Sequence, residues 1–203
     1  TVLGPEAFSV DIIRASLAFK ATRVGQLFDA ALGRLRSSDQ GQYWKGMELM
    51  AQRKVRRDDP RMAGVYGNFR RNLEEILQTG ARAHVPILLC TVGVNLRDCP
   101  PFAALPAPAP GGVDEAAAWK QNYQSALALE AEGRGLEAVP HYEAASKRDA
   151  APAELHYRLA RCLLALERTK EAREHFQQAV DEDALRFRAD SEINRIIRHA
   201  ASA

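Results

Sequence analysis

The sequence has few of the features that specify membrane spans, disulfide frameworks or thiolate metal sites. A membrane-spanning helix needs about 20 apolar residues, and the longest apolar run, residues 86–94, is about half that length. No basic-then-apolar segment opens the chain, so no export signal is expected. The three cysteines form no C-x-x-C pair, which favours reduced thiols. These absences predict a soluble protein and leave its compartment open.

Motifs for catalysis, cofactors and nucleic acids are also missing. The five histidines show neither H-E-x-x-H nor zinc-ligand spacing, and there is no phosphate loop or dinucleotide fingerprint, so no metal and no cofactor are expected. No serine lies in a G-x-S-x-G elbow or a G-D-S block, which predicts no catalysis in this chain. The basic run at residues 53–57 stands in a chain of net charge +2 and is interpreted as a solvated helix face, so no nucleic-acid partner is expected.

The residues that are present indicate a globular protein with two unlike halves. Hydrophobic residues make up 46% of the chain and charged residues 27%, a balance that excludes overall disorder. Residues 1–100 carry 15 Lys and Arg against 10 Asp and Glu, whereas residues 101–203 carry 13 against 16. A segment rich in Pro, Ala and Gly at residues 100–113 favours an extended course. We therefore expect a segment at 1–99, a linker at 100–113 and a second domain at 114–203.

Apolar spacing predicts that the first half is mostly helical. Residues 10–35 repeat apolar side chains on one helical stripe, and a shorter helix is expected at about 44–55. Asp59 followed by Pro60 is a strong start signal, and the helical spacing that follows continues to Gly80.

After this helix the pattern changes to a short, continuous apolar run at residues 85–92. Such a run is typical of a parallel strand that is buried on both faces. A single strand leaves its own backbone groups unpaired, and no second convincing strand is present. Three alternatives follow: the run is not a strand, its sheet lies outside this sequence, or another chain supplies the pairing, for instance a second copy through residues 87–92. The apolar stripes of the helices in the first half offer a second route to a homo-oligomer.

The second half repeats itself with a period of 34 residues. Two segments, residues 133–145 and 167–179, resemble the turn and second helix of the tetratricopeptide repeat family. The resemblance covers about residues 115–203, with first helices near 116–131 and 153–166 and a third helix near 187–200. It implies a mainly α-helical α-α superhelix of two helix–turn–helix repeats and a capping helix, used as a protein-protein interaction module. The matching residues are Ala126 and Ala160, Leu129 and Leu163, Arg134 and Arg168, Ala138 and Ala172, Tyr142 and Phe176, and Ala145 and Ala179.

Two polar positions also recur in these repeats. Asn122 and His156 stand where the family has Trp, and His141 and His175 occupy equivalent positions in the second helices. Their recurrence reflects the repeat and does not indicate a metal site.

The resemblance implies that the first helix of each repeat lines a concave binding face. Aromatic and Arg side chains there are usual interface anchors, and the basic residues predict an acidic protein or peptide partner; the alternative is an ordinary solvated surface. The expected face consists of Lys120, Tyr123, Leu127, Tyr157, Arg161, Leu164, Arg188, Ser191 and Arg195.

The first half resembles a different family. Residues 68–102 carry a helix, an apolar run and the pattern T-x-x-x-N-L-x-D-x-P-P from Thr91 to Pro101, an order similar to GDSL/SGNH hydrolase-like proteins that contain tetratricopeptide repeats. The resemblance implies an α/β esterase whose serine, oxyanion and Asp-x-x-His blocks lie beyond these residues, so this sequence would be its middle segment. Asn95 and Asp98 follow the apolar run and are predicted either to face a catalytic pocket or to shape a turn.

Overall fold

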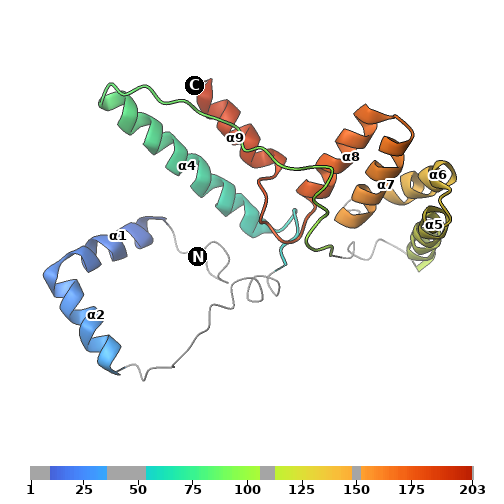
Figure 1. The fold of residues 1–203 in the computed structure, drawn as a ribbon. Helices are drawn as coiled ribbons and strands as arrows, with labels where there is room; N and C mark the ends of the chain where they lie inside the picture. Colours follow the sequence, from blue (N-terminus) through green and yellow to red (C-terminus); the bar gives the residue numbers. More distant parts are fainter. Residues whose placement is uncertain (1–9, 36–53, 106–112, 148–151, 203) are drawn as a thin grey trace. The chain divides into compact units, whose positions relative to one another are not determined.

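A computed structural model describes residues 10–35, 54–105, 113–147 and 152–202, and all regular structure in these ranges is α-helical. The chain forms two compact units, residues 1–52 and 53–203 (Figure 1). The prediction of a mainly α fold is therefore confirmed. The division at 52/53 differs in place from the predicted linker at 100–113, of which residues 106–112 lie outside the described ranges.

The described part of the first unit consists of two helices, α1 (Val10–Ala21) and α2 (Arg23–Leu35), where a single helix over residues 10–35 was predicted. The single-helix prediction is wrong because Thr22 ends α1 and caps α2. Its hydroxyl donates to the carbonyl of Phe19 at 2.7 Å and accepts from the backbone N–H of Gly25 at 3.1 Å. A Cβ on Gly25 would lie 2.0 Å from the Phe19 oxygen, so only glycine fits this crossing. The helix predicted at 44–55 lies outside the described residues except for 54 and 55, which are not helical.

The second unit begins with α4 (Pro60–Arg82), whose predicted start is confirmed. The Asp59 carboxylate accepts from the backbone N–H of Arg61 at 2.9 Å, and Pro60 occupies the first helical position. This helix packs against α9 (Ser191–Ala201), in which Ile196 is buried.

The apolar run at 85–92 does not form a strand, so that prediction is wrong. It belongs to an extended segment, residues 85–104, here called the strap, which follows α4 and passes α9 toward the repeat helices (Figure 1). A strand requires a neighbouring backbone for its ladder of hydrogen bonds, and none of the described residues supplies one. The segment has a strand-like sequence without a strand partner.

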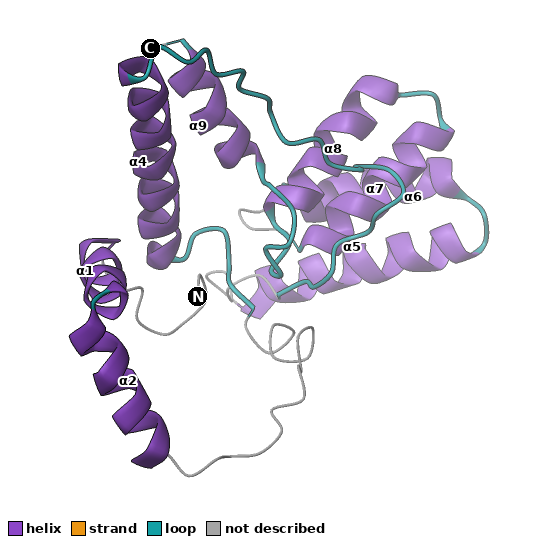
Figure 2. Cartoon of the chain, turned by 60° about the vertical axis from the view of Figure 1, so that its left-hand side comes forward, coloured by secondary structure: helices purple, strands orange, loops and turns teal. Residues whose placement is uncertain are grey.

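Four helices form the predicted repeats: α5 (Val113–Ala131), α6 (Gly135–Ser146), α7 (Ala153–Ala165) and α8 (Thr169–Asp181). Helix α5 packs against α6, α7 against α8, and α6 against α7, an arrangement visible in Figure 2. The alanines of the 34-residue pattern are buried and allow the helices to approach closely. The core cluster contains Ala126, Ala138, Tyr142, Ala145, Leu155, Leu159, Ala160, Leu163, Ala172 and Phe176.

The turns within the two repeats place equivalent residues in the left-handed region. Gly133 has φ of 75° and Glu167, 34 residues later, has φ of 60°. A side chain in this conformation costs about 1–2 kcal/mol, which glycine avoids. We expect Gly133→Ala to lower the free energy of unfolding by about 1 kcal/mol and Glu167→Gly to raise it by about 0.5 kcal/mol, because the greater freedom of glycine in the unfolded chain offsets part of the gain. Urea unfolding measures both, and Glu167→Ala is the control without a gain.

The third helix of the repeat region begins later than predicted and packs elsewhere. Residues 187–190 are not helical, because the Asp190 carboxylate accepts from the backbone N–H of Ile193 at 3.0 Å and sets the helix start at Ser191. Asp190 also accepts a hydrogen bond from the Tyr66 hydroxyl of α4. Helix α9 therefore packs against α4.

Candidate functional site

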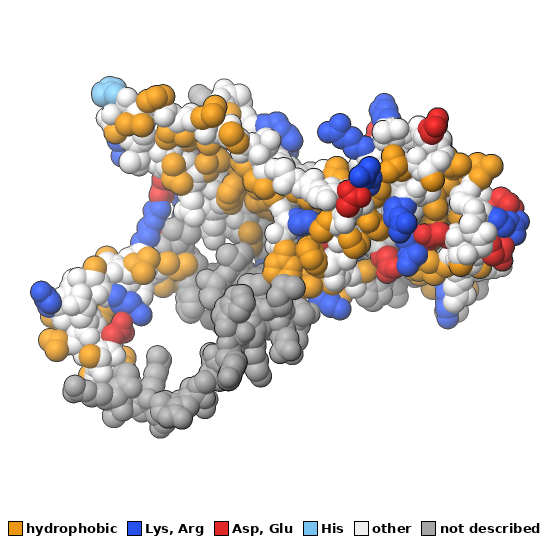
Figure 3. Space-filling view, in the orientation of Figure 1, with side chains coloured by type: hydrophobic (Ala, Val, Ile, Leu, Met, Phe, Trp, Pro, Cys, Tyr) orange, Lys and Arg blue, Asp and Glu red, His pale blue; other side chains and the backbone are white. Residues whose placement is uncertain are grey.

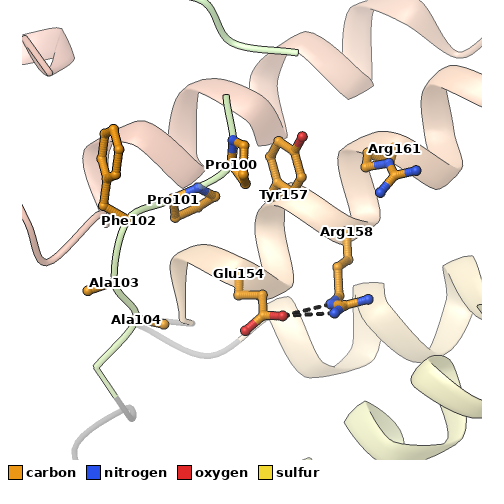
Figure 4. A pocket seen from close by; sticks show the side chains of 9 residues that line it. All are labelled: Pro100, Pro101, Phe102, Ala103, Ala104, Glu154, Tyr157, Arg158 and Arg161. Carbon is orange, nitrogen blue, oxygen red and sulfur yellow. Dashed lines mark hydrogen bonds and ion pairs between the residues drawn. The ribbon is translucent and has the colours of Figure 1, made fainter. Parts of the chain in front are cut away.

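A cleft lies between the strap and the first helix of the second repeat. Its volume is about 460 Å³. One wall is the end of the strap and the other is one face of α7 (Figure 4). The lining residues are Pro100, Pro101, Phe102, Ala103, Ala104, Glu154, Tyr157, Arg158 and Arg161.

The strap wall is held through its main chain. The Tyr157 hydroxyl donates to the carbonyl of Arg97 at 2.8 Å, and the Arg188 guanidinium donates to the carbonyl of Cys99 at 2.7 Å. Further along, the backbone N–H of Ala184 donates to the carbonyl of Ala103 at 2.9 Å. The repeat region thus binds an extended segment of its own chain, mostly through backbone carbonyls.

Asp183 is the centre of this attachment and is almost fully buried, with 2% of its surface exposed. Its carboxylate accepts from the backbone N–H groups of Phe102 at 3.0 Å and Ala103 at 3.1 Å. It also accepts from the Leu185 N–H at 3.1 Å and from the Arg188 guanidinium at 2.8 Å. A buried carboxylate with four donors is well compensated, so it fixes the strap to the loop after α8.

Of the two arginines on the α7 wall, one has carboxylate partners and the other has none among the described residues. Arg158 pairs with Glu154 at 2.9 Å and with Glu130 of α5 at 3.1 Å. Arg161, one turn further along α7, is exposed and forms no hydrogen bond or ion pair within the described ranges. It extends from the same helix as Tyr157 (Figure 4). The cleft therefore offers one uncompensated guanidinium beside an aromatic ring and two prolines.

The structure brings together two of the nine residues predicted for the binding face, Tyr157 and Arg161. Tyr123, Leu127 and Leu164 are partly buried against the core, and Lys120 is exposed on α5. Three others make contacts near or within the α8–α9 region: Arg188 holds the strap, Ser191 donates to Asp181 at 2.6 Å, and Arg195 pairs with Glu192 at 2.5 Å.

The site also contains residues that the sequence pattern did not predict. Glu154 and Arg158 lie on α7 within one turn of Tyr157. Helical spacing was therefore a signal from which they could have been predicted. Asp183 and the strap wall had no such signal, because their contacts join residues about 80 positions apart.

At equivalent positions, each repeat contains a polar pair between its two helices. In the first repeat Oδ1 of Asn122 lies 3.3 Å from Nδ1 of His141, and in the second Nδ1 of His156 lies 3.1 Å from Nδ1 of His175. The two imidazole rings stack with centroids 5.3 Å apart. Burial lowers the pKa of His156 from 6.5 to about 4, helped by the nearby His175. Burial also lowers the pKa of His175, so both rings are neutral at pH 7.

Asn95 and Asp98 form a turn, one of their two predicted roles. The Asn95 side-chain oxygen accepts from the backbone N–H of Asp98 at 2.9 Å, and the Asp98 carboxylate pairs with Arg97 at 2.9 Å. Within the described ranges, no group of three or more His, Cys, Asp or Glu side chains is placed to hold a metal ion. No helix in these ranges has the length and apolar character needed to cross a bilayer.

Antiparallel helix pairs that recur every 34 residues define a helical-repeat architecture. Residues 129–191 match the family model of the tetratricopeptide repeat, which supports a repeat protein of the kind used for protein interaction. No curated protein and no solved structure matched the chain. The family match does not reach residues 68–102, so it gives no support to the GDSL/SGNH resemblance.

Proposed function

We propose that this chain is a protein-binding module and that the cleft beside α7 docks an extended, acidic segment of a partner protein. The observation that carries the proposal is Arg161, an exposed guanidinium at the cleft without a counter-charge in the described ranges. Guanidinium groups bind carboxylates with a two-pronged geometry, so an acidic side chain is the complementary ligand.

The apolar part of the cleft favours a partner segment with a flat side chain. The Tyr157 ring lies across from Pro100 and Pro101 (Figure 4), and it is supported from behind by Phe176 at a centroid distance of 5.5 Å. A prolyl or aromatic side chain gains contact area in such a cleft at low entropic cost. An extended backbone already lies beside this cleft, since Tyr157 and Arg188 donate hydrogen bonds to carbonyls of the strap.

Arg161→Ala is expected to weaken binding of an acidic peptide about tenfold, because one charge-assisted hydrogen bond contributes about 1.5 kcal/mol. The probes are three fluorescein-labelled peptides on one Pro- and Phe-containing scaffold, with Glu, Gln or Lys at the charged positions. Fluorescence anisotropy should rank them Glu, Gln, Lys in falling affinity for the unaltered chain. Arg161→Ala should remove most of the difference between Glu and Gln.

Arg173→Ala is the matched control, since Arg173 is an exposed arginine of α8 that does not line the cleft. It should leave the ranking unchanged. Equal affinity for the Glu and Gln peptides, or an equal loss in both arginine variants, would contradict an acidic ligand at this cleft.

A second candidate function is that of a middle segment of a GDSL/SGNH-like esterase. It is supported by the order of motifs in residues 68–102 and by the strand-like run at 85–92. The surrounding open reading frame tests it: a G-D-S block upstream and Asp-x-x-His downstream support the esterase, and their absence contradicts it.

A further inference from the structure

The middle of the strap, residues 87–91, has backbone N–H groups without partners among the residues that the structure describes. From Ile87 to Thr91 no backbone N–H forms a hydrogen bond within the described part of the chain. Leu88 is 89% exposed, and Val85, Ile87 and Val92 are also exposed. Figure 3 shows hydrophobic side chains interspersed with other surface over the part of the second unit that carries the strap and α9. Exposed apolar side chains together with unpaired backbone groups are a template for strand addition.

This segment is held in an extended form at both ends. At its start the backbone N–H of Val85 donates to the carbonyl of Gly80 at 2.9 Å. The Ile87 side chain then covers Gly80 so closely that a Cβ there would lie 2.4 Å from Ile87 Cδ1. At its end the Asn194 side chain accepts from the Val92 N–H at 2.8 Å and donates to the Val92 carbonyl at 3.0 Å. A segment ordered in this way binds a strand at a reduced entropic cost.

The contact with Asn194 also decides which edge is free. In an extended chain the N–H and C=O of one residue point to the same edge, and the direction alternates along the chain. Val92 faces α9 through Asn194, so the backbones of Leu88 and Cys90 share that edge. Those of Ile87, Leu89 and Thr91 point to the opposite edge.

We propose that residues 86–92 are a preformed strand that joins the edge of a β-sheet in a partner polypeptide, through the backbones of Ile87, Leu89 and Thr91. A sheet suits the segment better than a second copy of it. Successive apolar residues require cover on both faces, and two copies paired alone would make a two-stranded ribbon with both apolar faces exposed, which is marginally stable.

The probe, here called the strand peptide, is an acetylated and amidated three-stranded β-sheet peptide whose edge strands alternate Val and Thr and end in Lys, because a sheet supplies the cover that a single strand lacks. On its addition, amide hydrogen exchange resolved by NMR should slow at least tenfold at Ile87, Leu89 and Thr91 and stay nearly unchanged at Leu88 and Cys90. A peptide N-methylated at alternate residues lacks the donors and should give no protection. Leu89→Pro removes a pairing N–H and should abolish protection, whereas Leu88→Pro, on the other edge, should retain it.

Two results would overturn the proposal. One is uniform protection, or none, in the presence of the strand peptide. The other is a dimer in light scattering with protection at 87–91 before any peptide is added, which would assign the edge to a second copy. Because the test is independent of Arg161, its failure leaves the acidic-peptide proposal standing, and Arg161→Ala should bind the strand peptide normally.

Discussion

Asp183→Ala is expected to lower the free energy of unfolding of the second unit by about 3–5 kcal/mol and to release the end of the strap. This magnitude is typical of removing one member of a buried ion pair, because the other charge is left without compensation. The partner is Arg188, which is 2.8 Å from Asp183 and whose Nε already has no hydrogen-bond partner among the described residues. Two backbone N–H groups of the strap, those of Phe102 and Ala103, lose their acceptor as well.

Urea unfolding followed by Trp119 fluorescence measures this loss. Trp119 lies in the repeat region, where its indole N–H donates to the carbonyl of Ala145 at 3.1 Å. The chain has two tryptophans, so a Trp44→Phe background isolates this signal. Amide hydrogen exchange at Phe102 and Ala103 reports release of the strap directly, and Asp183→Asn permits this measurement if the alanine variant does not fold.

Asp98→Ala is the matched control for Asp183→Ala. Asp98 also pairs with an arginine, at 2.9 Å, but both side chains are more than half exposed. Exposed pairs contribute about 0–1 kcal/mol, so this variant should unfold nearly like the unaltered chain. If the two variants lost similar stability, or if Phe102 and Ala103 kept their protection, Asp183 would not be the attachment point of the strap.

The repeat helices could be predicted from the sequence because their contacts are local and periodic. Ala126 and Ala160 recur at the fixed spacing of the helix pairs and are fully buried in the structure. The strap could not be predicted in this way. Its residues 85–92 have the composition of a buried strand, and whether they form one depends on a neighbouring backbone that the described residues do not provide.

The candidate site also contains residues that periodicity could predict and residues that it could not. Tyr157 and Arg161 were predictable, since they lie one turn apart on a helix whose register the repeat defines. Arg188 was assigned to the same face because a helix was expected from residue 187. Asp190 instead starts the helix at Ser191, and the Arg188 side chain reaches Asp183 and the strap. Helix capping, and contacts such as those of Arg188 with Asp183 and with the Cys99 carbonyl, decide where a side chain points, and periodicity does not report them.

Lowering the pH from 7 to 4 is expected to destabilise the second repeat through His156. Its pKa is lowered from 6.5 to about 4 in the folded protein, first by burial and then by the charge of His175. The unfolded chain therefore binds more protons in this range, so stability is complete above pH 6.5 and is lost as the pH falls toward 4. A shift of this size corresponds to about 3 kcal/mol.

The surroundings of the pair leave the direction of this effect unchanged. Glu143 on α6 and Glu171 and Glu174 on α8 favour a charged His175, yet burial outweighs them and lowers its pKa too. A proton that enters the pair places a charge between stacked rings whose centroids are 5.3 Å apart. Protonation should therefore loosen the contact between α7 and α8 before the rest of the repeat region responds.

The first repeat supplies the control, because Asn122 occupies the position equivalent to His156 and lies 3.3 Å from His141. His156→Asn should be nearly as stable as the unaltered chain at pH 7 and should lose about 2–3 kcal/mol less between pH 7 and 4. Urea unfolding at a series of pH values, in the Trp44→Phe background, measures the difference. Identical acid profiles for the two proteins would show that the histidine pair does not carry the acid sensitivity, since carboxylates elsewhere in the chain are common to both.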